Sequence, residues 1–146
     1  MNFKIAALLT SLLSIVSCGP SIDNSNETVG LHVISGFGEK YSFISNSPND
    51  IDISNTIDNL DWEGGFHQVI LVTSPGISIE VGGSLDPSDG LSSVYRDLNK
   101  EIYRVTVEPP ATVEEIKAIL LSFHSGDNKC CLLYTSPSPR DLSTSR

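Results

Sequence analysis

Positive charge, cysteine and long apolar runs are all scarce in this sequence. Nine lysine and arginine residues stand against 18 aspartate and glutamate residues, which gives a formal net charge of −9. Nucleic acids and anionic membrane surfaces repel such a chain, so we expect neither surface as a partner. The longest apolar stretch, residues 5–16, is too short to cross a bilayer core of about 30 Å as a helix.

The spacings that mark catalytic and metal sites are also missing. His32, His67 and His124 stand apart, without the H-E-x-x-H or paired-cysteine spacing that places ligands around one metal. Ser84 follows two glycines, but it has no G-x-S-x-G context and no phosphate-binding motif surrounds it. We therefore expect no enzyme, no metal and no cofactor. A hydrolytic activity that is lost on changing Ser84 or His67 would overturn this expectation.

What the sequence does contain is enough material for one small folded domain. Its 146 residues are 39% hydrophobic and 18% charged, which is typical of a chain that folds around one core. The acidic excess grows when both ends are set aside, since residues 18–129 hold 17 acidic and six basic side chains. Such an excess permits a basic protein partner, or it only maintains solubility.

The N-terminal segment has the pattern of an export signal. Lys4 precedes the apolar residues 5–16, and Ile15-Val16-Ser17-Cys18 follows. This tetrapeptide resembles the bacterial lipobox, in which a signal peptidase cuts before a cysteine that becomes lipidated. The resemblance implies a lipid-anchored protein of the cell envelope with Cys18 as its first mature residue. The alternative is an ordinary signal peptide, or an uncleaved anchor, with a chance cysteine.

We expect one folded domain with a signal peptide and a polar tether before it and a tail after it. We assign residues 1–17 to a lipoprotein signal peptide, residues 18–30 to a polar tether, residues 31–129 to the domain and residues 130–146 to a tail. Gly19 after the cysteine resembles the sorting pattern of outer-membrane lipoproteins that face the periplasm. Acyl chains add about 0.8 kcal/mol of membrane affinity for each buried methylene.

The tail has neither helical nor strand periodicity. Residues 131–146 read CLLYTSPSPRDLSTSR, and the first eleven resemble the translation of a transposase-type sequencing adapter. That resemblance implies that the natural chain is cut near Lys129, and that Cys130 and Cys131 are no disulfide partners. The alternative is a natural, disordered C-terminus.

Alternating and compact apolar segments predict an antiparallel sheet of four or more strands. Pro75-Gly76, a pair that is typical of turns, lies between the segments 69–72 and 77–81 and predicts a hairpin there. The glycines at 82 and 83 suggest a bulge or a close backbone approach at a strand end. The segments are residues 31–34, 41–45, 69–72, 77–81, 92–96 and 102–107.

Helical periodicity adds two helices to the sheet. Ile53, Ile57 and Leu60 predict a short helix over residues 50–61. Thr112 and Glu115 form a capping box ahead of an apolar stripe that Gly126 ends. The prediction is therefore an α+β domain whose C-terminal helix packs on one face of the sheet.

Four residues are candidates for partner binding. Trp62 and Tyr95 could line an exposed recognition face, and core packing is the alternative for both. Asp86 and Asp89 lie in the sequence LDPSDG, which lacks the full spacing of a calcium loop and also suits a turn.

Several segments resemble the small α+β domains of bacterial polymorphic-toxin immunity proteins and related families of unknown function. They read DWEGGFHQVILV from Asp61, ISIEVGGS from Ile77, DGLSSVY from Asp89 and VEEIKAILLSFHSGD from Val113. A tryptophan commonly follows the Gly-Asp in those families, and this chain departs from the pattern at Cys130. The resemblance implies a non-catalytic binding module that blocks a toxin. Together with the lipobox it predicts a membrane-anchored binding lipoprotein that neutralises a toxin. The alternative is an envelope structural or assembly lipoprotein.

Overall fold

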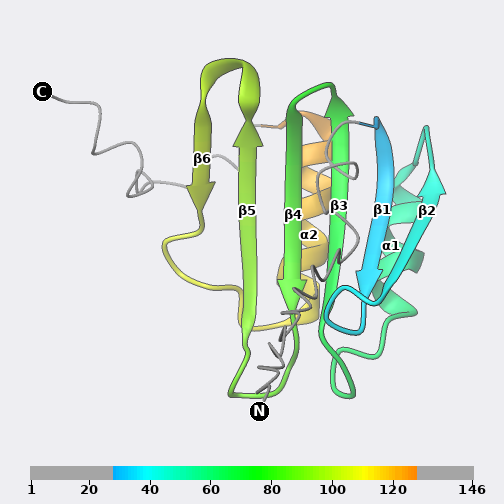
Figure 1. The fold of residues 1–146 in the computed structure, drawn as a ribbon, viewed down its shortest axis with the longest axis vertical. Helices are drawn as coiled ribbons and strands as arrows, with labels where there is room; N and C mark the ends of the chain where they lie inside the picture. The colour runs from blue at the N-terminus through cyan, green and yellow to red at the C-terminus, as the bar shows by residue number, and fades with distance from the viewer. Residues whose placement is uncertain (1–27, 128–146) are drawn as a thin grey trace, which may run out of the picture.

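The computed structural model describes residues 28–127, which form two layers (Figure 1). One layer is a six-stranded antiparallel sheet, and the other holds two helices against one face of that sheet. The predicted α+β class is confirmed, with a short first helix and a C-terminal helix. The elements are β1 (Gly30–Ser35), β2 (Lys40–Ser45), α1 (Asp50–Asp58), β3 (His67–Ser74), β4 (Ile77–Gly83), β5 (Leu91–Asp97), the 3-10 turn η2 (Leu98–Lys100), β6 (Ile102–Val105) and α2 (Val113–Ser125).

The strand order across the sheet is β2-β1-β3-β4-β5-β6. From β3 onward the sheet is a meander, and the predicted hairpin at Pro75-Gly76 is confirmed. Gly76 has a φ of +80°, a conformation that favours glycine. The first strand lies between β2 and β3, because α1 carries the chain from β2 back across the helix layer before β3 begins.

Both helices begin at residues that satisfy their first amides. Asn49 accepts hydrogen bonds from the main-chain N–H groups of Ile51 and Asp52, and Asp52 accepts in return from the Asn49 N–H. In α2 the Thr112 hydroxyl accepts from the Glu115 N–H at 3.2 Å. The Glu115 carboxylate accepts from the N–H of Ala111 at 2.6 Å, one residue before the cap, so the predicted box is offset on that side.

Several element bounds differ from the predictions. The first helix ends at Asp58, three residues before the expected end. Gly30 is the first residue of β1 and not the last of a tether. The fourth strand extends through Gly83, and β6 ends at Val105, two residues early.

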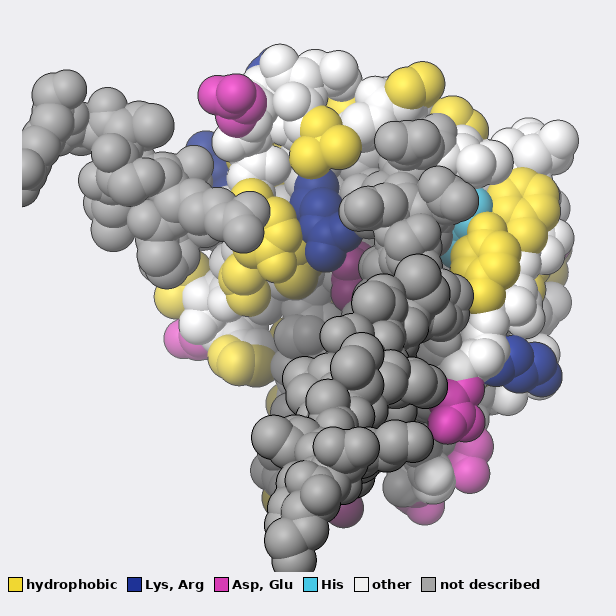
Figure 2. Space-filling view, viewed as in Figure 1, with side chains coloured by type: hydrophobic (Ala, Val, Ile, Leu, Met, Phe, Trp, Pro, Cys, Tyr) yellow, Lys and Arg dark blue, Asp and Glu magenta, His cyan; other side chains and the backbone are white. Residues whose placement is uncertain are grey.

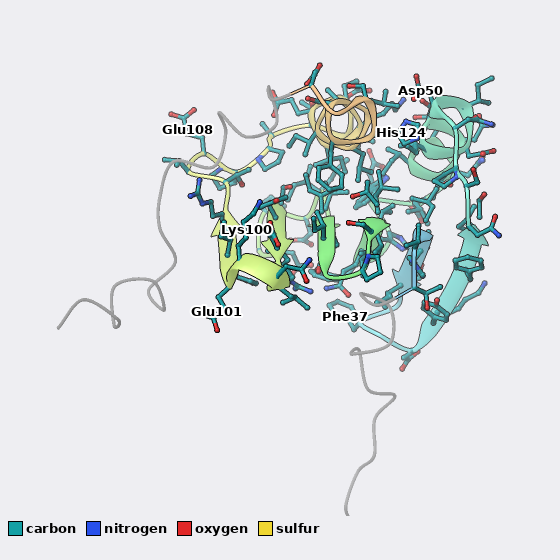
Figure 3. All side chains as sticks on the ribbon, turned by 90° about the horizontal axis from the view of Figure 1, so that it is seen from above. Phe37, Asp50, Lys100, Glu101, Glu108 and His124 are labelled. Atoms are coloured by element: carbon teal, nitrogen blue, oxygen red, sulfur yellow. The ribbon has the colours of Figure 1, made fainter. Side chains whose placement is uncertain are left out.

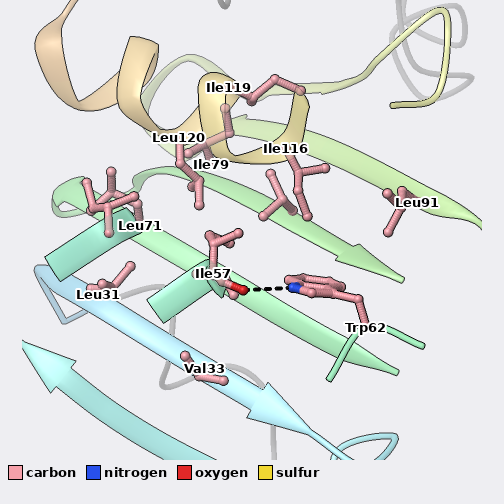
Figure 4. Packing of buried hydrophobic residues seen from close by; sticks show 13 residues of the cluster. Leu31, Val33, Ile57, Trp62, Leu71, Ile79, Leu91, Ile116, Ile119 and Leu120 are labelled. Carbon is pink, nitrogen blue, oxygen red and sulfur yellow. Dashed lines mark hydrogen bonds between the residues drawn. The ribbon is translucent and has the colours of Figure 1, made fainter. Parts of the chain in front are cut away.

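The main core lies between the sheet and the helix layer (Figure 4). Isoleucines 53 and 57 of α1 and isoleucine 116 of α2 have no exposed surface, and truncating one such side chain costs about 2–5 kcal/mol. The apolar stripe predicted on α2 is confirmed by the burial of Ile116, Ile119 and Leu120. The core consists of Leu31, Val33, Ile53, Ile57, Trp62, Val69, Leu71, Ile79, Val81, Leu91, Ile116, Ile119 and Leu120.

An ion pair and a histidine–carboxylate hydrogen bond join the helices at their surfaces. Lys117 of α2 pairs with Asp58 of α1. His124 Nδ1 lies 2.8 Å from Asp50 Oδ1, and the view from above shows the two side chains next to each other (Figure 3). Residues 1–17, which we predict to be a signal peptide, Cys18 and residues 130–146 lie outside the described residues, so the expectations about them remain predictions.

Candidate functional site

Three loops meet at one end of the sheet. The register places Ser35, His67 and Gly83 side by side on β1, β3 and β4. The loops that adjoin them are residues 36–39, 59–66 and 84–90, and Figure 1 shows all three at the lower end of the sheet. We call these three segments the loop end.

Hydrogen bonds connect the three loops to one another and to the strands. The Gly36 N–H donates to the Phe66 carbonyl oxygen at 3.1 Å, and the Leu85 N–H donates to the Trp62 carbonyl oxygen at 2.7 Å. Each bond joins two loops that are far apart in sequence. The loop end is therefore a preorganised surface and loses little conformational freedom when a partner binds.

Phe37 is the most exposed large hydrophobic residue of the described chain, at 76%. Its ring stacks on Phe66, with 5.3 Å between centroids, and Figure 3 labels it on the side of the sheet away from the helices. Its φ of +57° is left-handed, and a bulky side chain in that conformation costs about 1–2 kcal/mol. The fold thus holds an exposed aromatic ring in a strained turn, a combination that is frequent at functional sites.

The loop of residues 84–90 is organised by its own side chains. The Ser84 hydroxyl donates to Asp89 Oδ2 at 2.9 Å and accepts from the Asp86 N–H at 3.2 Å. Ser84 is buried and serves the turn. Gly83 has a φ of +124°, and a Cβ there would overlap the Gly90 carbonyl oxygen. The close backbone approach predicted at this strand end is therefore confirmed.

The exposed charge of the loop end is predominantly negative. Five exposed carboxylates belong to the three loops. One positive side chain, Lys40, lies directly after the first loop, at the start of β2. The carboxylates belong to Glu39, Asp61, Glu63, Asp86 and Asp89.

Hydrogen bonds within its own turn favour the charged form of the Asp86 carboxyl. The main-chain N–H and the hydroxyl of Ser88 donate to Asp86 Oδ1, at 2.8 and 2.7 Å. These bonds, the main-chain one first, hold the pKa of the Asp86 carboxyl below its ordinary value of 3.8. The same bonds therefore favour a negative charge on Asp86 in the folded protein.

A serine and a histidine meet where β1 and β3 reach the loop end. His67 Nε2 donates to the Asp61 carbonyl oxygen at 3.0 Å, and His67 Nδ1 accepts from the Ser35 hydroxyl at 2.9 Å. This assignment follows because a carbonyl oxygen can only accept. The Gly36 N–H, the next main-chain donor, is already bonded to Phe66. It is therefore not available to stabilise an oxyanion beside Ser35.

The four residues chosen from the sequence are not one site. Trp62 and the turn of Asp86 and Asp89 come together at the loop end, through the bond from Leu85 to Trp62. Trp62 is only 4% exposed and belongs to the core, so for Trp62 the core-packing alternative is the one observed. Tyr95 is half-buried on the helix side and packs edge-on against Phe123, 6.0 Å between centroids.

Scans against models of protein families, against curated proteins and against solved structures each found no match to this chain. Within residues 28–127, no three histidine, cysteine, aspartate or glutamate side chains converge where they could hold a metal ion. Neither helix of that same region is long and apolar enough to cross a membrane.

Sequence reasoning missed one residue of the loop end, Phe37, and one beside it, Ser35. Phe37 was not singled out, because nothing in Ser35-Gly36-Phe37-Gly38 says which residue takes the left-handed conformation. Ser35 was missed because its partner His67 is 32 positions away. The pairing of both residues depends on the register of β1 with β3, which is a long-range property.

Proposed function

We propose that this protein is a membrane-anchored, non-catalytic binding lipoprotein that acts as an immunity protein and neutralises a toxin. The loop end is its binding surface, and acylated Cys18 holds it in the cell envelope, at the outer membrane facing the periplasm. The observation that carries this proposal is Phe37, an aromatic ring that is held exposed in a strained turn of the loop end, which also carries five exposed carboxylates.

An exposed aromatic residue is suited to be the centre of a protein interface. Tryptophan, tyrosine, arginine and other large side chains contribute most of the binding energy in such interfaces. Phe37 and Leu85 are the exposed large hydrophobics of the loop end, at 76% and 40%. A partner with an apolar pocket would bury Phe37 first.

The exposed carboxylates of the loop end favour a basic partner. Opposite charge accelerates association and discriminates against acidic proteins. Toxins that act on nucleic acids or on anionic membranes are commonly basic, because their targets are negatively charged. A carboxylate-rich surface would bind the basic surface of such a toxin, as its anionic target does.

The local chemistry supports binding and not catalysis. Ser84 and both turn aspartates are engaged in bonds within their own loop. The Ser35–His67 pair lacks a free main-chain donor at Gly36, and the orienting group for His67 is a carbonyl and not a carboxylate. Such a pair stabilises the junction of two strands.

Protection of growth tests the proposal directly. The product of the gene beside this one is exported to the periplasm of a test strain, with the full-length protein or a variant. We expect the wild type to restore growth and Phe37→Asp to abolish protection, because aspartate tolerates the turn but cannot fill an apolar pocket.

A matched control distinguishes a loss of binding from a loss of folding. Leu98→Asp alters an equally hydrophobic residue, 59% exposed, at the opposite end of the sheet, and should protect fully. If the neighbouring product is harmless and the protein instead copurifies with envelope-assembly factors, the structural or assembly alternative replaces the immunity role. Full protection by Phe37→Asp would show that the loop end is not the binding surface.

A further inference from the structure

A groove of about 350 Å³ runs between the edge strand β2 and helix α1. Figure 1 shows α1 behind β1 and β2, at one side of the sheet. The groove begins at the loop end, because Asn59 belongs to that surface and Lys40 directly follows the loop of residues 36–39. One wall holds Lys40, Ser42 and Ile44 of β2, and the other holds Asp52, Asn55 and Asn59 of α1 and its C-cap.

The main chain of β2 is open to a further strand. Within residues 28–127, β1 is the one strand that pairs with it. In an antiparallel sheet, every second residue of an edge strand directs its N–H and C=O groups away from the neighbouring strand. Residues 40–43 pair regularly with β1, and the irregularity of the register falls after them, at Ile44. These four residues therefore offer main-chain donors and acceptors on their outer side.

Four polar side chains of the groove have no hydrogen-bond or ion-pair partner among residues 28–127. They belong to Lys40, Ser42, Asn55 and Asn59. Asp52 Oδ2 accepts from the Asn49 N–H at 3.0 Å, which leaves Asp52 Oδ1 for a ligand. Ammonium, hydroxyl, amide and carboxylate groups together can bond every polar group of a peptide. The groove therefore suits a polar, extended chain.

The spacing of the two asparagines matches that of a β-strand. Asn55 and Asn59 are four residues apart, so their side chains lie about 5–6 Å from each other on one face of α1. Side chains on one face of a strand recur every second residue, at about 6.6 Å. Two successive inward-facing residues of an added strand thus meet the two asparagines. Serine, threonine, asparagine and glutamine suit these positions, because an amide both donates and accepts.

The two ends of the groove carry opposite charge. Lys40 lies at the loop end, and Asp52 lies at the other end, in the first turn of α1. Figure 2 shows this edge of the molecule, with a basic side chain at its lower end above acidic ones. A strand antiparallel to β2 passes Asp52 first and Lys40 last. Charge complementarity favours a basic residue at the start of such a strand and a carboxylate at its end.

We propose that the groove binds an extended segment of the toxin, which pairs with β2 as a seventh strand of the sheet. This inference rests on the proposed function and names the structure that the partner presents. The segment runs antiparallel to β2, with a basic side chain at Asp52, polar side chains at Asn55 and Asn59 and an acidic group at Lys40. Since the groove opens onto the loop end, the same toxin can also bury Phe37. Strand addition to a sheet edge is a common mode of peptide recognition.

Amide hydrogen exchange of the full-length protein tests the pairing. Exchange is followed by NMR, with and without the purified product of the gene beside this one. We expect the amides of residues 40–43 that do not pair with β1 to exchange at least tenfold more slowly in the complex. The other edge strand, β6, is the internal control, and its amides should keep their exchange rates within about twofold.

Two variants of α1 test the groove itself. Asn55→Arg places a long cationic side chain in the groove and should weaken binding of the same product at least tenfold. Ile51→Arg adds the same charge to the same helix, at a residue that is 69% exposed and does not line the groove. This control should bind within about threefold of wild type.

The outcomes separate this inference from the proposed function. Unchanged exchange of residues 40–43 in a complex that still depends on Phe37 would overturn the strand pairing and leave toxin neutralisation intact. Absence of any binding by the wild type would overturn both. Exchange of residues 40–43 that slows with protein concentration alone would assign the edge to a second copy of this chain and exclude the toxin segment.

Discussion

The indole Nε1 of Trp62 donates a hydrogen bond to the main-chain carbonyl oxygen of Ile57 at 2.9 Å (Figure 4). The bond joins the last turn of α1 to the loop that leads into β3, and the Trp62 ring also meets His67 edge-on at 5.6 Å. Trp62 therefore fixes the base of the loop end from within the core, while Phe37 presents its surface.

Trp62→Phe should lower the free energy of unfolding by about 1–3 kcal/mol, because it leaves a buried carbonyl oxygen without its donor. Urea denaturation measures the loss. Phe43→Leu is the control, since an exposed residue of similar size should change stability by less than about 0.5 kcal/mol. Equal effects of the two substitutions would show that Trp62 is not a structural anchor.

Phe37→Gly should separate stability from binding. Relief of the left-handed strain, about 1–2 kcal/mol, offsets the lost ring stacking, about 0.5–1.5 kcal/mol. The free energy of unfolding should therefore change by less than about 1 kcal/mol, while partner affinity falls by about 2 kcal/mol or more. A large loss of stability with unchanged affinity would make Phe37 a structural residue.

Ser88→Ala should raise the pKa of the Asp86 carboxyl toward 3.8 without reaching it, because the main-chain N–H still donates. A depressed pKa means that Asp86 stabilises the fold above its unfolded-state pKa, and that this contribution is lost as the pH falls through the folded value. Carboxyl carbon NMR titration follows the group. Ser92→Ala, on strand β5 after this loop, should leave the pKa of Asp86 unchanged. A change in that pKa would indicate that the substitutions alter the whole fold.

Asp97→Ala should cost about 1–2 kcal/mol of stability. Asp97 is buried, and its Oδ1 accepts from the Lys100 N–H at 3.3 Å. Its Oδ2 contacts Lys100 Nζ at 3.1 Å, without hydrogen-bond geometry. Asp97 raises the pKa of Lys100, so the same variant should return that pKa toward 10.5. Leu98→Ala in the same turn is the control, because the Leu98 side chain is 59% exposed, and it should change stability by less than about 0.5 kcal/mol and leave the pKa of Lys100 raised.

Local patterns predicted most of this fold. The alternation of β4, the proline–glycine turn and the cap at Thr112 each depend on a few neighbouring residues, and the structure contains all three. The insertion of β1 between β2 and β3 was not predicted, because strand order depends on contacts between distant segments.

The candidate site was predicted only in part. Asp86 and Asp89 lie on the loop end, as a turn sequence suggests, whereas Trp62 and Tyr95 pack inward. Aromatic side chains give the same signal in a core and on a surface, and the difference depends on which face of the sheet the helices cover. The exposure of the Phe37 ring could not be predicted from the sequence, because it depends on the left-handed backbone conformation of that residue.

Calorimetric titration of the purified toxin with wild type, Phe37→Asp and Leu98→Asp tests the central claim, that the loop end is the binding surface. We expect Phe37→Asp to bind at least about 30-fold more weakly than wild type, as a loss of about 2 kcal/mol implies, and Leu98→Asp to bind within about threefold of wild type. Binding by Phe37→Asp within threefold of wild type would contradict it.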